Sequence, residues 1–440
     1  SSDLYNILGE TSSYDKKRSL EKNKPKSWLK SVSAFANGSG GRLIFGIDEG
    51  DEIVGLMDYK GNSEFISERI KTKLEPIPDF EMEIETIEDK VILVLTVFPG
   101  ENTPYFYVDS GSRIAFKRIG NQSVPVNNMD LLNLTLKGQK RSYDSLPSEL
   151  NVEDVSFQEL KNEYKRRSGK TFEETDLESF GLVTKQGKLT IAGALFADGH
   201  QLYQSRVFCT RWNGLNKTHA LIEALDDKEF EGNLLYLLDA SLRFVKMNTR
   251  KMWRKGKVYR EEFVDYPERA LQEAIVNALV HRDYSIVGSE VHIDIYDDRL
   301  EVYSPGGMYD GTFIQDHDLK NIVSLRRNPL IADVMSRMDL MERRGSGLRK
   351  IIESYEKEKN FKQGLEPEFR STENAFFTLL KNLNYDYYQQ TTYDVLSEGR
   401  SEGQNEGQSE GQTFSPQKRR ESILYYMRLS PDITAQLLSQ

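Results

Sequence analysis

Three side chains that can act on phosphate recur at intervals of four residues. Glu273, Asn277 and His281 stand in the stretch "LQEAIVNALVHRDY", and this spacing places all three on one face of a helix. A carboxylate and an amide one turn apart can hold a hydrated magnesium ion and polarise a water molecule for attack on phosphorus. The spacing alone fits an amphipathic helix with a polar flank equally well.

Two glycine-rich turns that follow this stretch favour the phosphate interpretation. "SPGGMYDG" at 304–311 contains Gly306 and Gly307, and "ERRGSGLRK" at 342–350 leads into a predicted helix. Glycines let backbone amides approach phosphate oxygens, and a helix N-terminus adds positive partial charge. The candidate cradle consists of Arg343, Arg344, Gly345, Ser346 and Gly347. In this order the motifs predict a nucleotide site, although each turn alone is common.

A block of basic residues lies near the start of the chain. It holds seven cationic residues against two acidic ones between positions 15 and 30. The cations are Lys16, Lys17, Arg18, Lys22, Lys24, Lys26 and Lys30, and Lys117 and Arg118 in "AFKRIGNQS" extend them. In a chain of formal net charge −10, such a block predicts regional contact with nucleic-acid phosphates. A solvated helix face is the alternative.

The overall composition bounds the remaining possibilities. At 440 residues the chain is expected to form two to four folded units. Its acidic balance argues against coating of DNA or of a membrane by the whole surface. Its single cysteine, Cys209, indicates neither a disulfide nor a usual structural zinc site, and is expected to be buried. We expect a cytoplasmic protein that does not enter a membrane.

The pattern of apolar residues predicts an α+β multidomain protein. A helix around 27–35 and several β-rich stretches form a first domain at 1–138, and a connecting α/β region follows at 139–255. Residues 256–385 run as helix, strands, glycine turn and helix, which is the layout of an α/β sandwich.

The end of the chain has a different composition. A flexible linker is expected at 386–414 because "SEGRSEGQNEGQSEGQT" has no apolar residue to support a core. Residues 415–440 form a predicted helical tail. Its serine cap, basic helix and Ser430-Pro431 break fit the start of a helix-turn-helix, and an oligomerising tail fits equally well.

Residues 256–385 resemble the GHKL-type ATPase fold, in the branch found in bacterial proteins once labelled RecG-like or divergent AAA. The resemblance implies that the protein uses ATP with Mg²⁺ or Mn²⁺, with Glu273 as general base, Asn277 as magnesium ligand and Gly345 to Gly347 as phosphate lid. The family usually has an Asp-x-Gly-x-Gly turn that bonds the adenine amino group. Here that turn reads Ser304-Pro305-Gly306-Gly307.

Residues 1–138 resemble a Schlafen AlbA-type domain through "SVSAFANGSGGRLIFGIDEGDEIVGL" and "FKRIGNQS". Schlafen-type RNases use an acidic pair five residues apart and a distant acid to hold a divalent metal. The resemblance assigns these roles to Glu10, Asp15 and Asp48, with Lys17 nearby and Asp51 as a substitute for Asp48. Three carboxylates around a hard cation can position a water for phosphodiester cleavage.

Together these resemblances imply a protein that acts on nucleic acid, RNA or DNA, under the control of ATP. The leading hypothesis is a metal-dependent nuclease gated by ATP, with a role in defence against phage. The alternative is an ATP-responsive transcriptional regulator that binds DNA without cutting it, and a third hypothesis is a scaffold whose ATPase fold has lost its chemistry. A homo-oligomer is expected because pairing would strengthen a weak basic patch.

Overall fold

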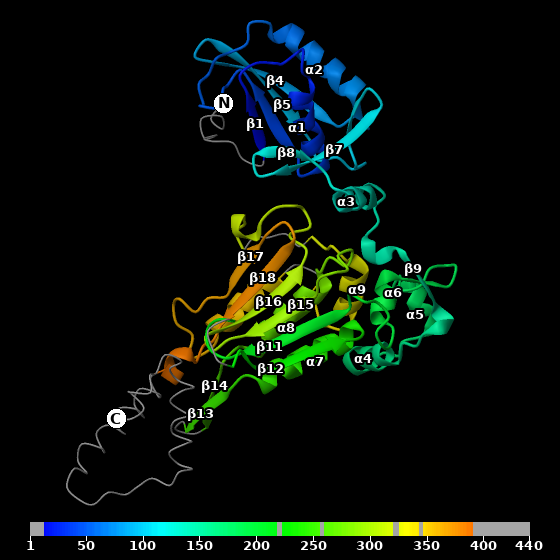
Figure 1. The fold of residues 1–440 in the computed structure, drawn as a ribbon, viewed down its shortest axis with the longest axis vertical. Coiled ribbons are helices and arrows are strands. Elements are labelled where there is room, and N and C mark those ends of the chain that lie inside the picture. The colour runs from blue at the N-terminus through cyan, green and yellow to red at the C-terminus, as the bar shows by residue number, and fades with distance from the viewer. Residues whose placement is uncertain (1–12, 218–221, 256–258, 320–324, 343–345, 390–440) are drawn as a thin grey trace, which may run out of the picture. The chain divides into compact units, whose positions relative to one another are not determined.

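The computed structural model describes residues 13–217, 222–255, 259–319, 325–342 and 346–389 (Figure 1). It divides the chain into a first unit, Ser1–Leu146, and a second unit, Pro147–Gln440. The domain limits predicted from the sequence stay predictions. The first residues of the linker predicted at 386–414 continue a helical turn to residue 389, where the Tyr388 hydroxyl donates to Asp265 at 2.6 Å. The rest of that linker and the tail predicted at 415–440 lie outside the described residues.

The first unit contains two four-stranded sheets. The strand orders are β1-β2-β5-β4 and β3-β6-β7-β8. The strands are β1 (Tyr14–Lys17), β2 (Gly41–Phe45), β3 (Leu74–Glu75), β4 (Phe80–Ile87), β5 (Lys90–Val97), β6 (Phe106–Asp109), β7 (Ser112–Ile119) and β8 (Gln122–Pro125). β1 runs parallel to β2 and pairs Asp15 with Leu43, so β1 is held at the edge of the first sheet.

Helix α1 (Lys26–Asn37) contacts strands of both sheets, which explains why it is buried from Trp28 almost without interruption to its end. Asn37 accepts a hydrogen bond from the backbone of Tyr105 and donates to the carbonyls of Tyr105 and Phe116. Gly41 is needed at the turn that follows, since a Cβ there would lie 2.3 Å from the Phe35 ring. The helix and glycine turn predicted here are confirmed.

Two further helices complete the first unit. α2 (Tyr59–Lys73) begins at Asp58, whose side chain accepts from the Gly61 amide. α3 (Asn128–Gly138) begins at Asn127, which caps the Asp130 amide in the same way. Such caps satisfy backbone donors that have no partner within the helix.

The second unit opens with short elements and continues with a six-stranded sheet. The opening elements are β9 (Pro147–Asn151), α4 (Gln158–Ser168), α5 (Glu174–Ser179), β10 (Lys188–Thr190) and α6 (Ile191–Phe196). The strands of the sheet, in spatial order, are β12 (Ala224–Glu231), β11 (Arg206–Trp212), β15 (Val291–Ile295), β16 (Arg299–Pro305), β18 (Ala375–Lys381) and β17 (Glu368–Ser371). Cys209 in β11 is buried, as expected.

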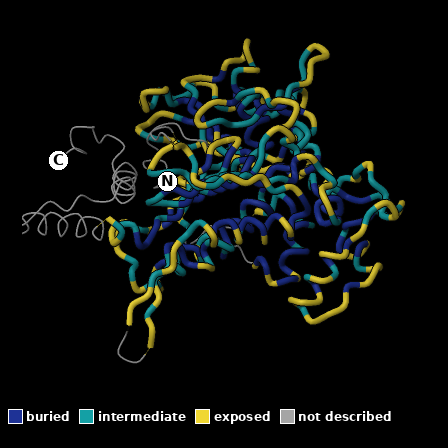
Figure 2. The backbone as a smooth tube through the Cα atoms, turned by 60° about the horizontal axis from the view of Figure 1, so that its bottom comes forward, coloured by how far each residue is buried: buried dark blue, intermediate teal, exposed yellow. Residues whose placement is uncertain are grey.

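Helices pack against this sheet. α7 (Leu234–Met247) contacts β11, α8 (Glu268–Val280) contacts β16, and α10 (Gly347–Glu356) packs on α8 (Figure 1). α9 (Pro329–Arg337) lies between β16 and α10 in the chain. The layers enclose a core of buried residues, drawn dark blue in Figure 2. The α/β sandwich predicted for this region is therefore confirmed.

A separate antiparallel ribbon precedes α8. It consists of β13 (Lys251–Lys255) and β14 (Arg260–Val264). The sequence interpretation does not anticipate this ribbon, and the domain limit expected between residues 255 and 256 falls between its two strands.

Candidate functional site

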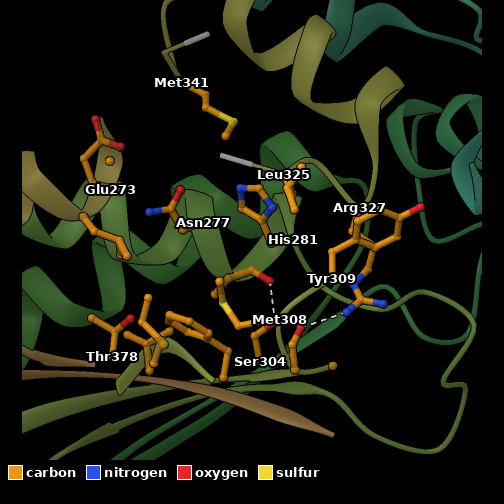
Figure 3. A pocket seen from close by; sticks show the side chains of 18 of the residues that line it. Glu273, Asn277, His281, Ser304, Met308, Tyr309, Leu325, Arg327, Met341 and Thr378 are labelled. Carbon is orange, nitrogen blue, oxygen red and sulfur yellow. Dashed lines mark hydrogen bonds between the residues drawn. The ribbon is translucent and has the colours of Figure 1, made fainter. Parts of the chain in front are cut away.

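The largest concentration of predicted residues surrounds a cavity beside α8, here called the α8 cavity. Its empty space is about 1020 Å³ with the open mouth included. Glu273, Asn277 and His281 follow one another along the helix face that borders it (Figure 3). Buried alanine, isoleucine, valine and leucine side chains hold the rest of α8 in the core.

Glu273 is the first of these three residues along the chain, and only 1% of its surface is exposed. Its carboxylate forms an ion pair with Arg269, one turn earlier in α8. Burial nevertheless holds the pKa of Glu273 above its ordinary value, and the Arg269 charge opposes this only in part. A carboxylate with a raised pKa accepts a proton more readily, which is the property of a general base.

The N-terminus of α10 faces Glu273 and Asn277. A Cβ on Gly347 would lie 2.9 Å from the Asn277 amide nitrogen and 3.3 Å from a Glu273 carboxylate oxygen. A larger residue at position 347 would therefore require the Asn277 side chain or the α10 backbone to shift. The first amides of a helix have no partner within the helix and attract anions, so this end of the cavity is suited to phosphate.

Glu342 also lines this end of the cavity. Its carboxylate accepts from the Ser346 hydroxyl and pairs with Lys350 of α10. These hydrogen bonds hold the pKa of Glu342 below its ordinary value. Glu342 therefore stays ionised, and it fixes the first turn of α10 to the segment before it.

The remaining walls of the cavity are mainly apolar. They come from β16, β18 and the segments around residues 308, 314, 325 and 341. Their apolar members are Val302, Met308, Ile314, Leu325, Met341 and Phe376, and Thr378 is a polar member. Ser304 of β16 donates its hydroxyl hydrogen to the Ala278 carbonyl, 2.7 Å away, which ties the strand to α8. A flat apolar ring such as a nucleotide base suits these walls.

Arg327 borders the cavity near His281 (Figure 3). It pairs with Asp283 at 2.8 Å and donates to the Gly307 carbonyl at 2.8 Å. Burial, with the charges of Arg327 and Arg326, lowers the pKa of His281 to about 4. The imidazole is therefore neutral near pH 7 and can act there as a hydrogen-bonding group without a charge.

The structure brings most of the predicted nucleotide-site residues together. Those that line the α8 cavity are Glu273, Asn277, His281, Gly306, Gly307 and Gly347. Ser346 is buried beside it and bonds to Glu342. Arg343, Arg344 and Gly345 lie outside the described residues. The apolar lining residues were missed, because β16 and β18 meet only in the folded sheet and no sequence signal links them.

The first unit contains a smaller, polar cavity beside β1, here called the β1 cavity. Its lining residues are Asp15, Lys17, Lys30, Ser31, Glu49, Arg118, Asn121, Gln122 and Ser123. Asp15 accepts from Lys17 and from the Ser31 hydroxyl at 2.7 Å each, and Arg118 lies 4.0 Å away. Ser31, Ser123, Asn121 and Gln122 were not anticipated, because α1, β7 and β8 join only in the fold.

The other predicted acids are placed differently. Asp48 accepts the backbone amides of Gly50 and Glu52 at 2.9 Å each, so its side chain closes its own turn. Its neighbour Glu49 lines the cavity instead. Glu10 lies outside the described residues. Within the described ranges, no group of three His, Cys, Asp or Glu side chains could hold a metal ion.

The predicted basic residues divide between the β1 cavity and other partners. Lys17, Lys30 and Arg118 line the cavity. Four of the other basic residues lie near carboxylates outside the cavity: Lys16 pairs with Asp51, Lys117 pairs with Asp130 at 2.8 Å, Arg18 lies 3.9 Å from Asp48, and Lys22 lies 3.5 Å from Asp58. Lys26 lies over the Tyr107 ring, and Lys24 is exposed to solvent.

Comparison with known protein families identifies two domains. Residues 10–127 match the family model described as "Schlafen, AlbA_2". Residues 288–380 match the model described as "Putative ATP-dependent DNA helicase recG C-terminal", a match that begins after α8. The chain therefore carries a Schlafen AlbA_2 domain and an ATPase-like domain of the RecG C-terminal type, as the sequence resemblances predicted. These domains associate it with ATP and with nucleic acid.

Two solved structures are similar to parts of this chain. One is the DIP2311 protein from Corynebacterium diphtheriae, with 19% identity, a TM-score of 0.45 and coverage of 84% of this chain and 75% of that one. The other is the N-terminal domain of a "Putative ATP-dependent DNA Helicase RecG-related Protein" from Nitrosomonas europaea, with 26% identity, a TM-score of 0.23 and coverage of 29% and 92%. None of the curated proteins matches.

Among the described residues, no helix is both long enough and apolar enough to span a membrane.

Proposed function

We propose that this chain, which carries a Schlafen AlbA_2 domain and a RecG-type ATPase-like domain, binds and hydrolyses ATP in the α8 cavity and binds nucleic acid with its first unit. The proposal that the chain binds and hydrolyses ATP rests on one observation: Glu273, Asn277 and the N-terminus of α10 at Gly347 lie together in the α8 cavity. A base, an amide ligand and a ring of backbone donors are the groups that phosphoryl transfer to water requires.

The residues present fit a magnesium nucleotide. Asn277 and Glu342 offer oxygen donors at the polar end of the cavity, and oxygen is the ligand atom that Mg²⁺ prefers. Bound there, Mg²⁺ would neutralise charge on the phosphate oxygens. The side-chain-free surface at Gly347 is the cradle into which phosphates fit.

Glu273 takes the proton of the attacking water. Its burial excludes bulk solvent and raises the pKa of its carboxyl group, so the proton passes to an oxygen that holds it well. Arg269 keeps the carboxylate ionised enough to act and fixes its direction. The neutral His281 and the apolar walls hold the base end of the nucleotide without adding charge.

Titration calorimetry with the full chain tests nucleotide binding directly. We expect ATP and ADP to bind with magnesium, and Asn277→Ala to weaken binding of ATP by roughly tenfold or more, the loss of one or two hydrogen bonds to charged groups. Gln272→Ala, on the same helix but not in the cavity lining, is the matched control. No binding of ATP or ADP by the parent chain would leave the scaffold hypothesis, and unchanged ATP binding in Asn277→Ala would remove Asn277 from the site.

Nucleic-acid binding by the first unit is supported by the three cations of the β1 cavity. Lys17, Lys30 and Arg118 surround the Asp15 carboxylate, which holds Lys17 and Arg118 in place. Three cations outnumber the two carboxylates of the lining, so the cavity favours a phosphate group. We expect Lys30→Ala to weaken binding of labelled RNA or DNA and to lower its salt dependence. Lys117→Ala, whose ammonium pairs with Asp130, is the control.

Cleavage of the bound strand is a second candidate function, and ATP would gate it. The observation that favours it is the presence of two carboxylates, Asp15 and Glu49, in one cavity with Lys17. Incubation of tRNA, single-stranded DNA and duplex DNA with magnesium or manganese, with and without ATP, tests it. Metal-dependent products that disappear in Glu10→Ala and Asp15→Ala support a nuclease. Binding without products supports the DNA-binding regulator.

A further inference from the structure

The second unit contains a dense block of basic residues that neither cavity uses. Residues 243–260 include eight lysines and arginines and no aspartate or glutamate. The whole chain has a formal net charge of −10, so this block stands out from its surroundings. It covers the end of α7 and most of the β13–β14 ribbon.

The ribbon register divides these residues between two faces. Cross-strand pairs share a face, and β13 pairs with β14 from Lys251↔Val264 to Lys255↔Arg260. One face therefore carries the partly buried Val264 and the exposed residues Lys251, Trp253, Lys255, Arg260 and Glu262. We call these five exposed residues the ribbon face. On the opposite face, Met252, Glu261 and Phe263 are partly covered.

Trp253 lies in the middle of the ribbon face. Its surface is 57% exposed, which is unusual for so large an apolar side chain. The Arg260 guanidinium lies 4.5 Å from the centre of the indole and covers part of it. Lys251 and Lys255 precede and follow Trp253 on the same face by the strand alternation. A flat aromatic surface is thus presented between cations.

The two acids that follow the block do not cancel its charge. Glu262 pairs with Lys251 at 2.6 Å and with Arg260 at 3.7 Å, and Glu261 pairs with Arg254 at 2.6 Å and with Lys359 at 3.1 Å. These partners lower the pKa of both carboxyl groups, so both stay ionised. Eight cations against two carboxylates leave an excess of six positive charges over residues 243–262.

Another exposed apolar surface of the second unit has the opposite surroundings. Leu225 in β12 is 58% exposed, but the same strand carries Asp226, Asp227, Glu229 and Glu231. That strand repels a polyanion, whereas the ribbon face attracts one. Aromatic side chains set among cations are the means by which proteins hold unpaired bases, because every base has a face that can stack.

We propose that the ribbon face is a second nucleic-acid site, which binds a single-stranded segment by stacking a base on Trp253 and contacting its phosphates with Lys251, Lys255 and Arg260. This inference takes only the class of ligand, nucleic acid, from the proposed function. The residues of the ribbon face lie in the second unit, and none of them lines either cavity. Duplexes bind less well because their bases are already stacked on one another. The geometry assigns no base preference to the site.

Fluorescence and anisotropy measurements on the full chain test the stacking step. A labelled single-stranded oligonucleotide should bind Trp253→Ala roughly tenfold more weakly than the parent chain, within the range for one stacked base. Trp253→Phe should retain affinity within a few-fold but lose most of the quenching of tryptophan fluorescence. Since Trp253 is exposed, all variants should unfold at the parent temperature.

Tyr203→Ala is the matched control. Tyr203 is 56% exposed and has the Arg206 guanidinium 4.1 Å from its ring centre, but Arg206 is paired with Glu229 and Glu231. It therefore repeats the aromatic and arginine arrangement in acidic surroundings. We expect Tyr203→Ala to bind the oligonucleotide as the parent chain does.

Salt dependence tests the phosphate contacts. Lys255→Ala and Arg260→Ala should each reduce the slope of log affinity against log salt by about one. Parent-like affinity in Trp253→Ala overturns the proposal, and so does duplex bound as tightly as single strand. A change of oligomeric state in Trp253→Ala, seen by ultracentrifugation, would instead identify a subunit contact and overturn it.

The same measurements separate this inference from the proposed function. If the parent chain binds nucleic acid and only Lys30→Ala weakens it, the ribbon face has no such role and the first unit keeps its own. If only the ribbon variants weaken binding, the proposal for the β1 cavity is wrong. If both Lys30→Ala and the ribbon-face variants weaken binding, the nucleic acid contacts two sites on this chain.

Discussion

The two cavities contain the same kinds of residues in different arrangements. In the β1 cavity the buried Asp15 accepts from Lys17 and Ser31, and Arg118 stands nearby. In the α8 cavity Glu273 pairs with Arg269, and burial raises the pKa of its carboxyl group. A carboxylate surrounded by donors serves as an anchor, whereas a buried carboxylate with a raised pKa can take a proton. The surroundings of a carboxylate decide its role more than the residue type does.

The largest expected effect is that of Glu273→Gln on ATP hydrolysis. Removing a general base costs about 10²–10⁴-fold in rate, so we expect kcat to fall in that range while ATP binding is retained. Because burial raises the pKa of Glu273, its charge opposes folding near pH 7. Tm should therefore equal or exceed that of the parent.

Steady-state phosphate release and calorimetric unfolding measure the two results. Glu268→Gln, on the exposed first turn of the same helix, should change neither. If Glu273→Gln hydrolyses ATP as fast as the parent chain, Glu273 is not the general base. Glu273 would then be a structural anchor, as we infer for Asp15.

Asp15→Ala should have the next largest effect, and on stability. It leaves the cations Lys17 and Arg118 without the carboxylate between them, which costs about 3 kcal/mol for a buried pair. The first unit should therefore unfold at a lower urea concentration than it does in the parent chain. Urea titration measures the change.

Glu49→Gln is the control for Asp15→Ala, since Glu49 lines the same cavity but is exposed. It should change the free energy of unfolding by less than about 0.5 kcal/mol. Equal effects of the two variants would contradict an anchoring role for Asp15.

Gly347→Ala should weaken ATP binding by roughly tenfold. The added Cβ lies 2.9 Å from the Asn277 amide nitrogen, so Asn277 or the α10 backbone must move out of position. Calorimetric titration measures the affinity. Gly288→Ala is the control, because no atom lies within 4 Å of a Cβ at that position, and parent-like binding in Gly347→Ala would mean that the end of α10 does not contact the nucleotide.

The smallest expected effect concerns pH and His281. The folded pKa is about 4 against 6.5 for an ordinary histidine, so the unfolded chain takes up a proton that the fold does not between these values. His281 therefore reduces stability as the pH falls from about 6.5 towards 4. His281→Gln should lose less stability than the parent between pH 7 and pH 5. Equal losses in urea titrations at both values would show that His281 is not the group responsible.

The fold of both units and one side of the α8 cavity could be predicted from the sequence. The spacing of Glu273, Asn277 and His281 determines a common helix face, because helix geometry depends only on the separation along the chain. The glycines around residues 306 and 347 likewise mark close approaches of the backbone. The roles of these residues, of the β1 cavity and of the tail at 415–440 stay predictions.

The sequence by itself determined where many of the helices and strands lie, since period and turn residues are local properties, but it did not indicate the β13–β14 ribbon. Only the tertiary structure decided which charges meet: it brings Glu49 into the β1 cavity and gathers the ribbon face around Trp253. Those contacts join residues far apart in the chain or depend on strand register. The spacing of residues in the sequence predicts neither kind of contact, because both depend on how strands pair and how elements pack in the folded protein.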